Sequence, residues 1–192
     1  SVSAFFLLCV LLVQTNIRGA ESFELQDGDR VVFLGDALIE QEQYAGWIEV
    51  MMTTAFPERD VTFRNLGWSA DTPSGKSRFG LSLLPAGREP AGEGWRQLVK
   101  QLKFTQPTVI VFGYGMASAL DSGMEGVAAF TQDYQRLVDT AKQMQPDLRC
   151  VLLSPLGRRA DQSRTIQTDA SVLTAYRKAV NQVADNNDGV FV

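Results

Sequence analysis

Short apolar runs rich in β-branched residues alternate with amphipathic segments along most of this chain. There are five such runs: RVVFLG (30–35), VTFRNLG (61–67), TVIVFG (108–113), CVLLSP (150–155) and GVFV (189–192). Three are almost continuously apolar, as expected of strands covered on both faces of a parallel sheet. The intervening segments carry apolar residues at helical spacing, such as Tyr44, Ile48 and Met52. The alternation predicts a three-layer, doubly wound (flavodoxin-like) α/β fold, with about five parallel strands and helices on both faces.

The composition limits the partners that we expect. The chain carries 18 basic and 22 acidic residues, for a net charge of −4, and this balance argues against nucleic acid and acidic membrane surfaces. It contains no histidine, so it cannot hold a Ser-His, Cys-His or zinc-histidine site. We expect neither a metal nor a cofactor.

The N-terminus carries the signs of an export signal. Residues 4–13 (AFFLLCVLLV) are too short to span a bilayer but have the length of a signal-peptide core. We expect a signal peptide over residues 1–20 and a single domain over residues 21–192. The residue before Cys9 is Leu8 rather than a small residue, which disfavours a lipid anchor. Because there is no initiator Met or basic leader, we interpret the front end as clipped.

The residues that follow the predicted strands are the first candidates for a site, because ligands bind at the carboxyl ends of strands in open parallel sheets. These segments are GDAL (35–38), GWSADT (67–72), GYGMAS (113–118) and SPLGRR (154–159). The GYG turn lacks the third glycine and the basic residue of nucleotide-binding loops. Arg158 and Arg159 offer a possible carboxylate or sulfate contact, although a solvated loop pair explains them equally well.

From about Arg30 to the C-terminus, these motifs resemble the blocks of the SGNH, or GDSL, hydrolases. Members of that family are mostly esterases and lipases that act on acyl groups, often on carbohydrates. The resemblance implies a nucleophilic serine directly after the first strand, where this chain has Gly35-Asp36-Ala37. It also implies an oxyanion-hole glycine in the second block, which we match to Gly67.

The remaining blocks depart further from the family pattern. The third block, Gly-x-Asn-Asp, aligns Gly115 with its glycine, Ala117 with the asparagine and Ser118 with the aspartate. The last block, Asp-x-x-His, has no counterpart before Val192, and we interpret the domain as truncated there. Truncation does not explain Ala37 or Ala117. A methyl group cannot attack a carbonyl carbon, so acyl-enzyme chemistry through position 37 is impossible.

Other residues near the strand ends have both a catalytic and a structural interpretation. Ser69, Ser118 and Ser154 carry hydroxyl groups, but a serine nucleophile needs an adjacent base. Asp36 and Asp71 are candidates for a carboxylate pair that activates water, although an aspartate after a strand more often caps a helix or fixes a turn.

Two aromatic residues and three backbone positions complete the predicted site. Trp68 and Tyr114 fall at the predicted mouth, where flat rings could stack on sugars or simply complete the rim of the core. The expected ligand contacts are Trp68, Asp71, Tyr114 and Ser118, and the expected equivalents of the oxyanion hole are Ala37, Gly67 and Ala117.

Three functional hypotheses follow from the sequence. The first is an exported SGNH-type acyl or carbohydrate esterase domain whose catalysis is impaired by Ala37. The second is a non-catalytic module that binds a small-molecule or carbohydrate ester ligand in the same cleft. The third is activation of water by Asp36, by Asp71 or by groups beyond Val192. A fold alone does not establish an activity, so the geometry of the cleft has to separate these hypotheses.

Overall fold

The structure is a computed structural model of the chain, and it describes residues 23–78, 92–156 and 169–192. A five-stranded parallel sheet has the strand order β2-β1-β3-β4-β5. Its strands are β1 (Arg30–Gly35), β2 (Thr62–Asn65), β3 (Val109–Gly113), β4 (Arg149–Leu152) and β5 (Val190–Phe191). This order confirms the predicted doubly wound, flavodoxin-like sheet.

Six α-helices and one short 3-10 helix connect the strands within the described residues. They are α1 (Ala37–Ala45), α2 (Trp47–Ala55), α3 (Glu93–Thr105), α4 (Met116–Ser122), η2 (Gly123–Gly126), α5 (Val127–Met144) and α6 (Ala170–Asn186). The helical spacing over residues 44–55 breaks at Gly46, which has φ 65° and ends α1. Glycine adopts this left-handed conformation at little steric cost, so α1 and α2 are separate helices.

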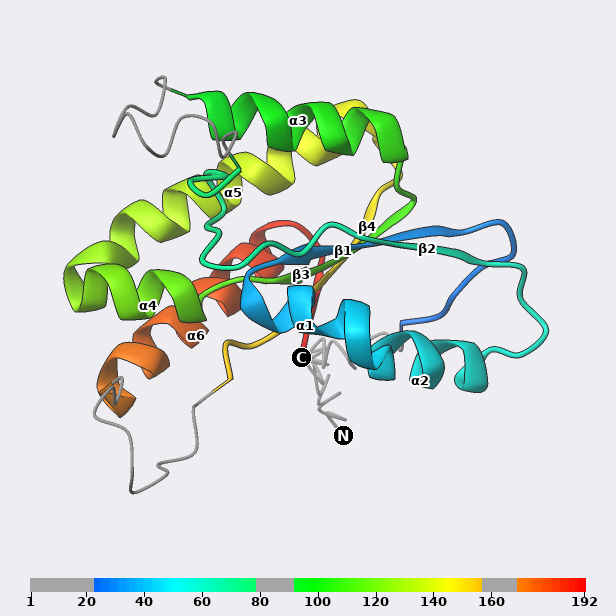
Figure 1. Cartoon of the computed structure of the whole chain (residues 1–192), viewed down its shortest axis with the longest axis horizontal. Helices are drawn as coiled ribbons and strands as arrows, with labels where there is room; N and C mark the ends of the chain where they lie inside the picture. The colour runs from blue at the N-terminus through cyan, green and yellow to red at the C-terminus, as the bar shows by residue number, and fades with distance from the viewer. Residues whose placement is uncertain (1–22, 79–91, 157–168) are drawn as a thin grey trace, which may run out of the picture.

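Helices cover both faces of the sheet, as predicted. Figure 1 shows α1 and α2 on one side of the strands and α3 and α5 on the other. Alternate residues of β1 point to opposite faces: Val32 and Leu34 join the core beneath α3, α5 and α6, whereas Val31 and Phe33 join the core beneath α1 and α2. Both cores are buried, which fixes the orientation of the strands that end at the cleft.

The amino ends of three strands are tied together by one buried carboxylate. Asp29, which precedes β1, accepts hydrogen bonds from Arg149 at the start of β4 and from the Thr108 hydroxyl (2.7 Å) just before β3. Burial raises the pKa of Asp29, but the bonds from Arg149, Gln26 and Thr108 outweigh it, so the net pKa is lowered. This network aligns the strands at the edge of the sheet opposite the cleft.

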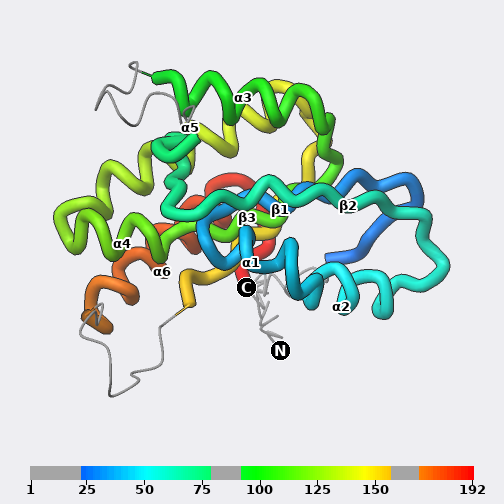
Figure 2. The backbone as a smooth tube through the Cα atoms, in the orientation of Figure 1, coloured from blue at the N-terminus to red at the C-terminus, as the bar shows by residue number. Residues whose placement is uncertain are grey.

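At the carboxyl edge, the chain turns directly from strand to helix. Figure 2 shows the backbone passing from β1 into α1 and from β3 into α4.

Among the described helices, none has the length and apolar character needed to cross a membrane.

Candidate functional site

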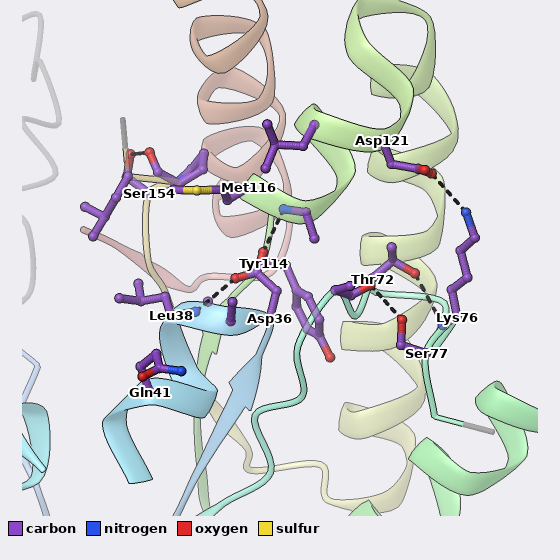
Figure 3. A pocket seen from close by; sticks show the side chains of 17 residues that line it. Asp36, Leu38, Gln41, Thr72, Lys76, Ser77, Tyr114, Met116, Asp121 and Ser154 are labelled. Atoms are coloured by element: carbon purple, nitrogen blue, oxygen red, sulfur yellow. Dashed lines mark hydrogen bonds and ion pairs between the residues drawn. The ribbon is translucent and has the colours of Figure 1, made fainter. Parts of the chain in front are cut away.

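A pocket of about 770 Å³ lies at the carboxyl ends of β1, β3 and β4 (Figure 3). Four segments line it. They are the start of α1 (Asp36, Ala37, Leu38, Gln41), the loop after β2 (Ala70, Thr72, Lys76, Ser77), the segment from the end of β3 through α4 (Gly113, Tyr114, Met116, Ala117, Leu120, Asp121) and the residues after β4 (Ser154, Pro155, Leu156). The position is the one expected for a ligand in a doubly wound sheet, and the size suits a small organic molecule.

Two paired glycines let α1 approach the strand ends closely. Gly35 and Gly113 lie opposite one another in the register of β1 and β3. A Cβ atom at Gly35 would lie 2.3 Å from the Gly113 carbonyl oxygen and 2.5 Å from the Cγ1 atom of Ile39. No other residue fits there, and the close packing of Ile39 places the first turn of α1 beside the first turn of α4.

Asp36 ties these two helices together at the floor of the pocket. One carboxylate oxygen caps α1 by accepting the Leu38 N–H (3.4 Å), and the other accepts the Ala117 N–H of α4 (3.1 Å). The residue is only 2% exposed. Burial raises the pKa of its carboxyl group, and the surrounding backbone N–H groups oppose that rise. Both carboxylate oxygens of Asp36 are therefore hydrogen-bond acceptors at the N-terminal ends of α1 and α4.

The structure brings together two of the predicted site residues, Ala37 and Ala117. Ala37 is the first residue of α1 and is exposed, and Ala117 lies in the first turn of α4 and is half-buried. Both line the pocket. At the position where the family resemblance implies a nucleophile, the pocket therefore contains only a methyl group.

Gly67 occupies a different place from the one expected from the sequence. It is not among the residues that line the pocket, and its N–H donates to the Asn65 side-chain oxygen (2.7 Å). A Cβ atom at Gly67 would lie 2.3 Å from the Glu40 backbone nitrogen, so this glycine permits close packing beneath α1. It is not placed to act as an oxyanion donor in the pocket.

Ala70 lines the pocket instead, and the sequence reasoning missed it. It has φ 57°, a left-handed conformation that alanine rarely adopts and that glycine adopts freely. Its carbonyl oxygen accepts a hydrogen bond from the Ser77 hydroxyl (2.7 Å). In the sequence, nothing distinguishes this residue from an ordinary loop alanine, because the strain arises only from the path of the folded loop.

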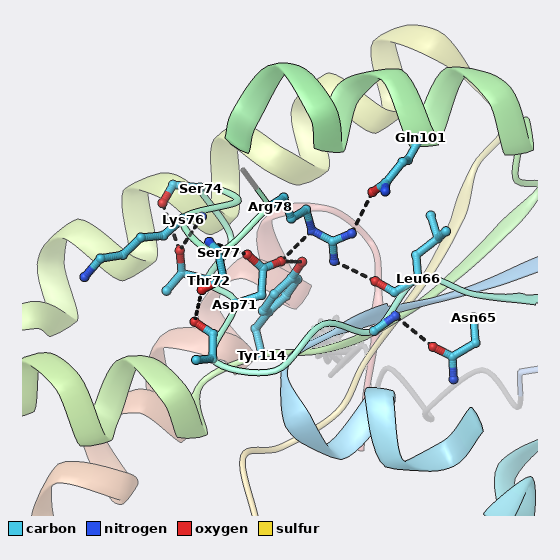
Figure 4. A network of polar contacts seen from close by, with 12 residues as sticks. Asn65, Leu66, Asp71, Thr72, Ser74, Lys76, Ser77, Arg78, Gln101 and Tyr114 are labelled. Atoms are coloured by element: carbon cyan, nitrogen blue, oxygen red, sulfur yellow. Dashed lines mark hydrogen bonds and ion pairs between the residues drawn. The ribbon is translucent and has the colours of Figure 1, made fainter. Parts of the chain in front are cut away.

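Asp71 belongs to a buried ion pair and does not line the pocket. Its carboxylate accepts hydrogen bonds from Arg78 (2.6 Å) and from the Tyr114 hydroxyl (3.1 Å), as Figure 4 shows. The two charged side chains are at most 1% exposed. Arg78 also donates to the Gln101 side chain (2.7 Å) and to the Leu66 carbonyl (2.6 Å). Asp71 thus fixes the loop after β2 and does not form a water-activating pair with Asp36.

Arg78 and Tyr114 keep their ordinary protonation states in this network. Burial would lower the pKa of Arg78, but Tyr114 and Asp71 raise it more, so the guanidinium stays protonated. The pKa of Tyr114 is raised well above its usual value by burial and by Asp71. The phenol is therefore neutral, and it acts as a hydrogen-bond donor.

Several hydroxyl groups in and near the pocket are already hydrogen-bonded to other residues of the chain. Within the pocket, the Thr72 hydroxyl pairs with Ser74 (2.9 Å) and the Ser154 hydroxyl donates to the Pro155 carbonyl (3.4 Å). Ser69 bonds to Glu40 outside the pocket lining, and Ser118 is 5% exposed and likewise lies outside that lining. Within the described residues, none of these serines has a histidine partner.

The two aromatic candidates do not present flat faces to the pocket. Trp68 is 42% exposed but is not one of the pocket-lining residues. Tyr114 lines the pocket yet is only 1% exposed, and its ring packs edge-on against Tyr134 with 5.8 Å between centroids. Sugar stacking on these rings therefore lacks the expected geometry.

Arg158 and Arg159 lie outside the described residues, as do residues 1–20. The described residues contain no group of three or more His, Cys, Asp or Glu side chains placed to hold a metal.

Comparison with solved structures identifies known proteins that share this fold. No family model and no curated protein matches the sequence. Among solved structures, a lipase/acylhydrolase from Enterococcus faecalis matches with a TM-score of 0.61 and 15% identity, over 88% of this chain and 75% of that chain. The chain thus has the fold of the SGNH/GDSL hydrolases.

Two further structures illustrate the range of that fold. A proposed GDSL-like lipase from Parabacteroides merdae has a TM-score of 0.58 and 16% identity, and an acetyl xylan esterase from Geobacillus stearothermophilus has a TM-score of 0.56 and 16% identity. Each match covers 88% of this chain and 78% of the other. At this level of identity the likeness establishes the fold alone, so the chemistry of the pocket has to be argued from its own residues.

Proposed function

We propose that this chain is an exported SGNH-fold domain that binds a small ester ligand in the pocket and does not hydrolyse it through an acyl-enzyme. The observation that carries the proposal is Ala37, which lies at the pocket surface at the start of α1. An acyl-enzyme needs an oxygen or sulfur nucleophile at the reacting carbon. Position 37 supplies neither.

The surroundings of Ala37 support the same conclusion. The Ala117 N–H points to the Asp36 carboxylate, so this donor is already occupied by an internal anion. At position 117 the side chain is a methyl group, which cannot donate a hydrogen bond to an oxyanion. Loss of one oxyanion donor typically costs about 10²–10³ in rate. The missing donor would weaken a catalyst, and the missing nucleophile removes the covalent route.

Direct activation of water by Asp36 is a second catalytic route to consider among the described pocket residues. A general base must reach a water molecule that faces the ester carbon. Each oxygen of Asp36 instead accepts a backbone N–H from a helix start. We therefore assign Asp36 a structural role. The Asp36→Asn variant should bind the same ligands as wild type and should show the same absence of turnover.

The test combines chemical labelling with turnover. Wild type is treated with a serine-reactive fluorophosphonate and, separately, with p-nitrophenyl butyrate. We expect no adduct at Ser69, Ser77 or Ser154 by peptide mass spectrometry, and hydrolysis no faster than with an equal mass of serum albumin. Stoichiometric labelling of one pocket serine, with matching ester turnover, would overturn the proposal.

Export rests on the N-terminal sequence. The ten-residue apolar run over residues 4–13 supports a cleaved signal. Fusion of residues 1–25, preceded by an initiator Met, to alkaline phosphatase tests this in a bacterial host. We expect phosphatase activity outside the cytoplasm and a mature N-terminus at or near Glu21. Activity that does not exceed that of a leaderless fusion would contradict export.

A further inference from the structure

The pocket has two unlike walls. Figure 3 shows Leu38 and Met116 on one side, with Thr72, Ser77 and Lys76 on the other. The apolar wall is extended by side chains from α4 and from the segment after β4: Leu120, Pro155 and Leu156. Leu120 is 46% exposed and Leu156 is 53% exposed. A ligand that covers these leucines removes apolar surface from water, which is the main source of affinity in such pockets.

The polar wall offers few hydrogen-bonding groups that are not already engaged. Thr72 pairs with Ser74, and the Ser77 hydroxyl donates to the Ala70 carbonyl. A sugar would have to find partners for several hydroxyl groups, and each unsatisfied polar group costs about 1–3 kcal/mol when it is buried. This wall therefore offers few free partners to the hydroxyl groups of a carbohydrate.

One ion pair at the rim selects the charge of the ligand. Lys76 and Asp121 are 2.9 Å apart, and each side chain is 58% exposed. The ammonium group has three protons, so it can keep its bond to Asp121 and still donate to a ligand carbonyl. Because the charges of Lys76 and Asp121 already cancel each other, the rim gives no net attraction to an anionic ligand and leaves a place for a neutral carbonyl or hydroxyl.

We propose that the pocket binds a neutral single-chain amphiphile, with its alkyl or acyl chain along Leu38, Met116 and Leu120 and its uncharged head at Lys76. This inference rests on the proposed function, and it names the ligand class of that same pocket. The acyl group of an ester, rather than any attached sugar, is then the part that the pocket recognises.

The experiment is a calorimetric titration of the full chain with 1-butanol, 1-hexanol, 1-octanol, sodium octanoate and acetylated xylobiose. Burial of each methylene contributes about 0.8 kcal/mol, so Kd should fall about fourfold per added methylene from butanol to octanol. Octanoate should bind at least tenfold more weakly than octanol. Acetylated xylobiose should show no saturable heat at millimolar concentration.

Substitutions in the apolar wall test where the alkyl chain of the ligand lies in the pocket. Leu120→Asp and Leu156→Asp place a charge on the apolar wall at partly exposed positions, and each should weaken octanol binding about tenfold or more. Phe104→Ser is the matched control, because Phe104 is 89% exposed on α3 and is not a pocket residue; its octanol Kd should equal that of wild type. Unfolding curves of all three variants show whether each is folded.

Several outcomes would overturn the inference. They are a Kd independent of chain length, binding of octanoate as tight as that of octanol, tighter binding of acetylated xylobiose, or octanol binding unaffected by either aspartate variant. Alcohols cannot be hydrolysed, so this result is separate from the turnover assay. Ester hydrolysis together with chain-length-dependent alcohol binding would refute the proposed function and leave the ligand class standing.

Discussion

The buried Asp71–Arg78 pair fixes the loop that forms one wall of the pocket, and we predict that breaking it lowers the free energy of unfolding. In the Arg78→Met variant, the Asp71 carboxyl group loses its 2.6 Å partner in a site with no exposed surface. Removal of one member of a buried pair costs about 3–5 kcal/mol. The Leu66 carbonyl and the Gln101 side chain also lose a donor. We expect the free energy of unfolding to fall by about 4 kcal/mol.

Urea denaturation followed by circular dichroism measures this loss, and a double variant isolates its cause. Asp71→Leu combined with Arg78→Met removes both charges, so it should be at least about 2 kcal/mol more stable than Arg78→Met alone. Lys76→Met is the control from the same loop. Its ion pair with Asp121 is mostly exposed, so its loss should leave the unfolding curve close to that of wild type.

Two results would refute this reasoning. The first is a loss below about 1 kcal/mol for Arg78→Met, which would mean that the pair is solvated rather than buried. The second is a double variant that is no more stable than Arg78→Met. That outcome would mean that the lost contacts of Arg78, and not the stranded Asp71 carboxyl group, dominate the cost.

Three further predictions follow. Ala70→Gly should raise the free energy of unfolding by about 1 kcal/mol, because glycine accepts φ 57° without strain; no gain in urea denaturation would count against this backbone conformation. Because the pKa of Asp29 is lowered in the folded chain, its contribution is present above the unfolded pKa near 3.8 and is lost as the pH falls through the folded value; wild type should therefore lose stability more steeply than Asp29→Asn below pH 4, and parallel curves would contradict this. In Ala37→Cys, iodoacetamide at pH 8 should alkylate position 37 but leave Cys150 unmodified, since burial raises the pKa of Cys150 to about 11; peptide mass spectrometry that finds the reverse pattern would show that position 37 is not open to the pocket.

The sequence predicts the sheet well because its signal is local. The runs 30–35 and 108–113 are apolar enough to indicate strands buried on both faces, and the structure pairs them as β1 and β3. The helix expected over residues 44–55 is interrupted at Gly46. Apolar spacing does not show this break, because the same spacing continues on both sides of it.

The site is predictable only where a residue directly follows a strand. Ala37 and Ala117 meet in the pocket because β1 and β3 are neighbours and each passes almost at once into a helix. The loop after β2 is longer, and its path depends on the contact of Asp71 with Arg78 and Tyr114. Such a long-range pairing leaves no local pattern, and for this reason Gly67 and Trp68 were expected in the pocket while Ala70 was not.

The measurement that bears most directly on the central claim is steady-state hydrolysis of p-nitrophenyl acetate, butyrate and octanoate by the purified full chain. The same preparation is first shown to be folded by its cooperative urea unfolding curve. Because position 37 has no nucleophile, we predict rates that rise linearly with ester concentration and match those of serum albumin at equal mass. Saturable hydrolysis that disappears in Leu120→Asp, a variant that places a charge on the apolar wall of the pocket, would contradict the account.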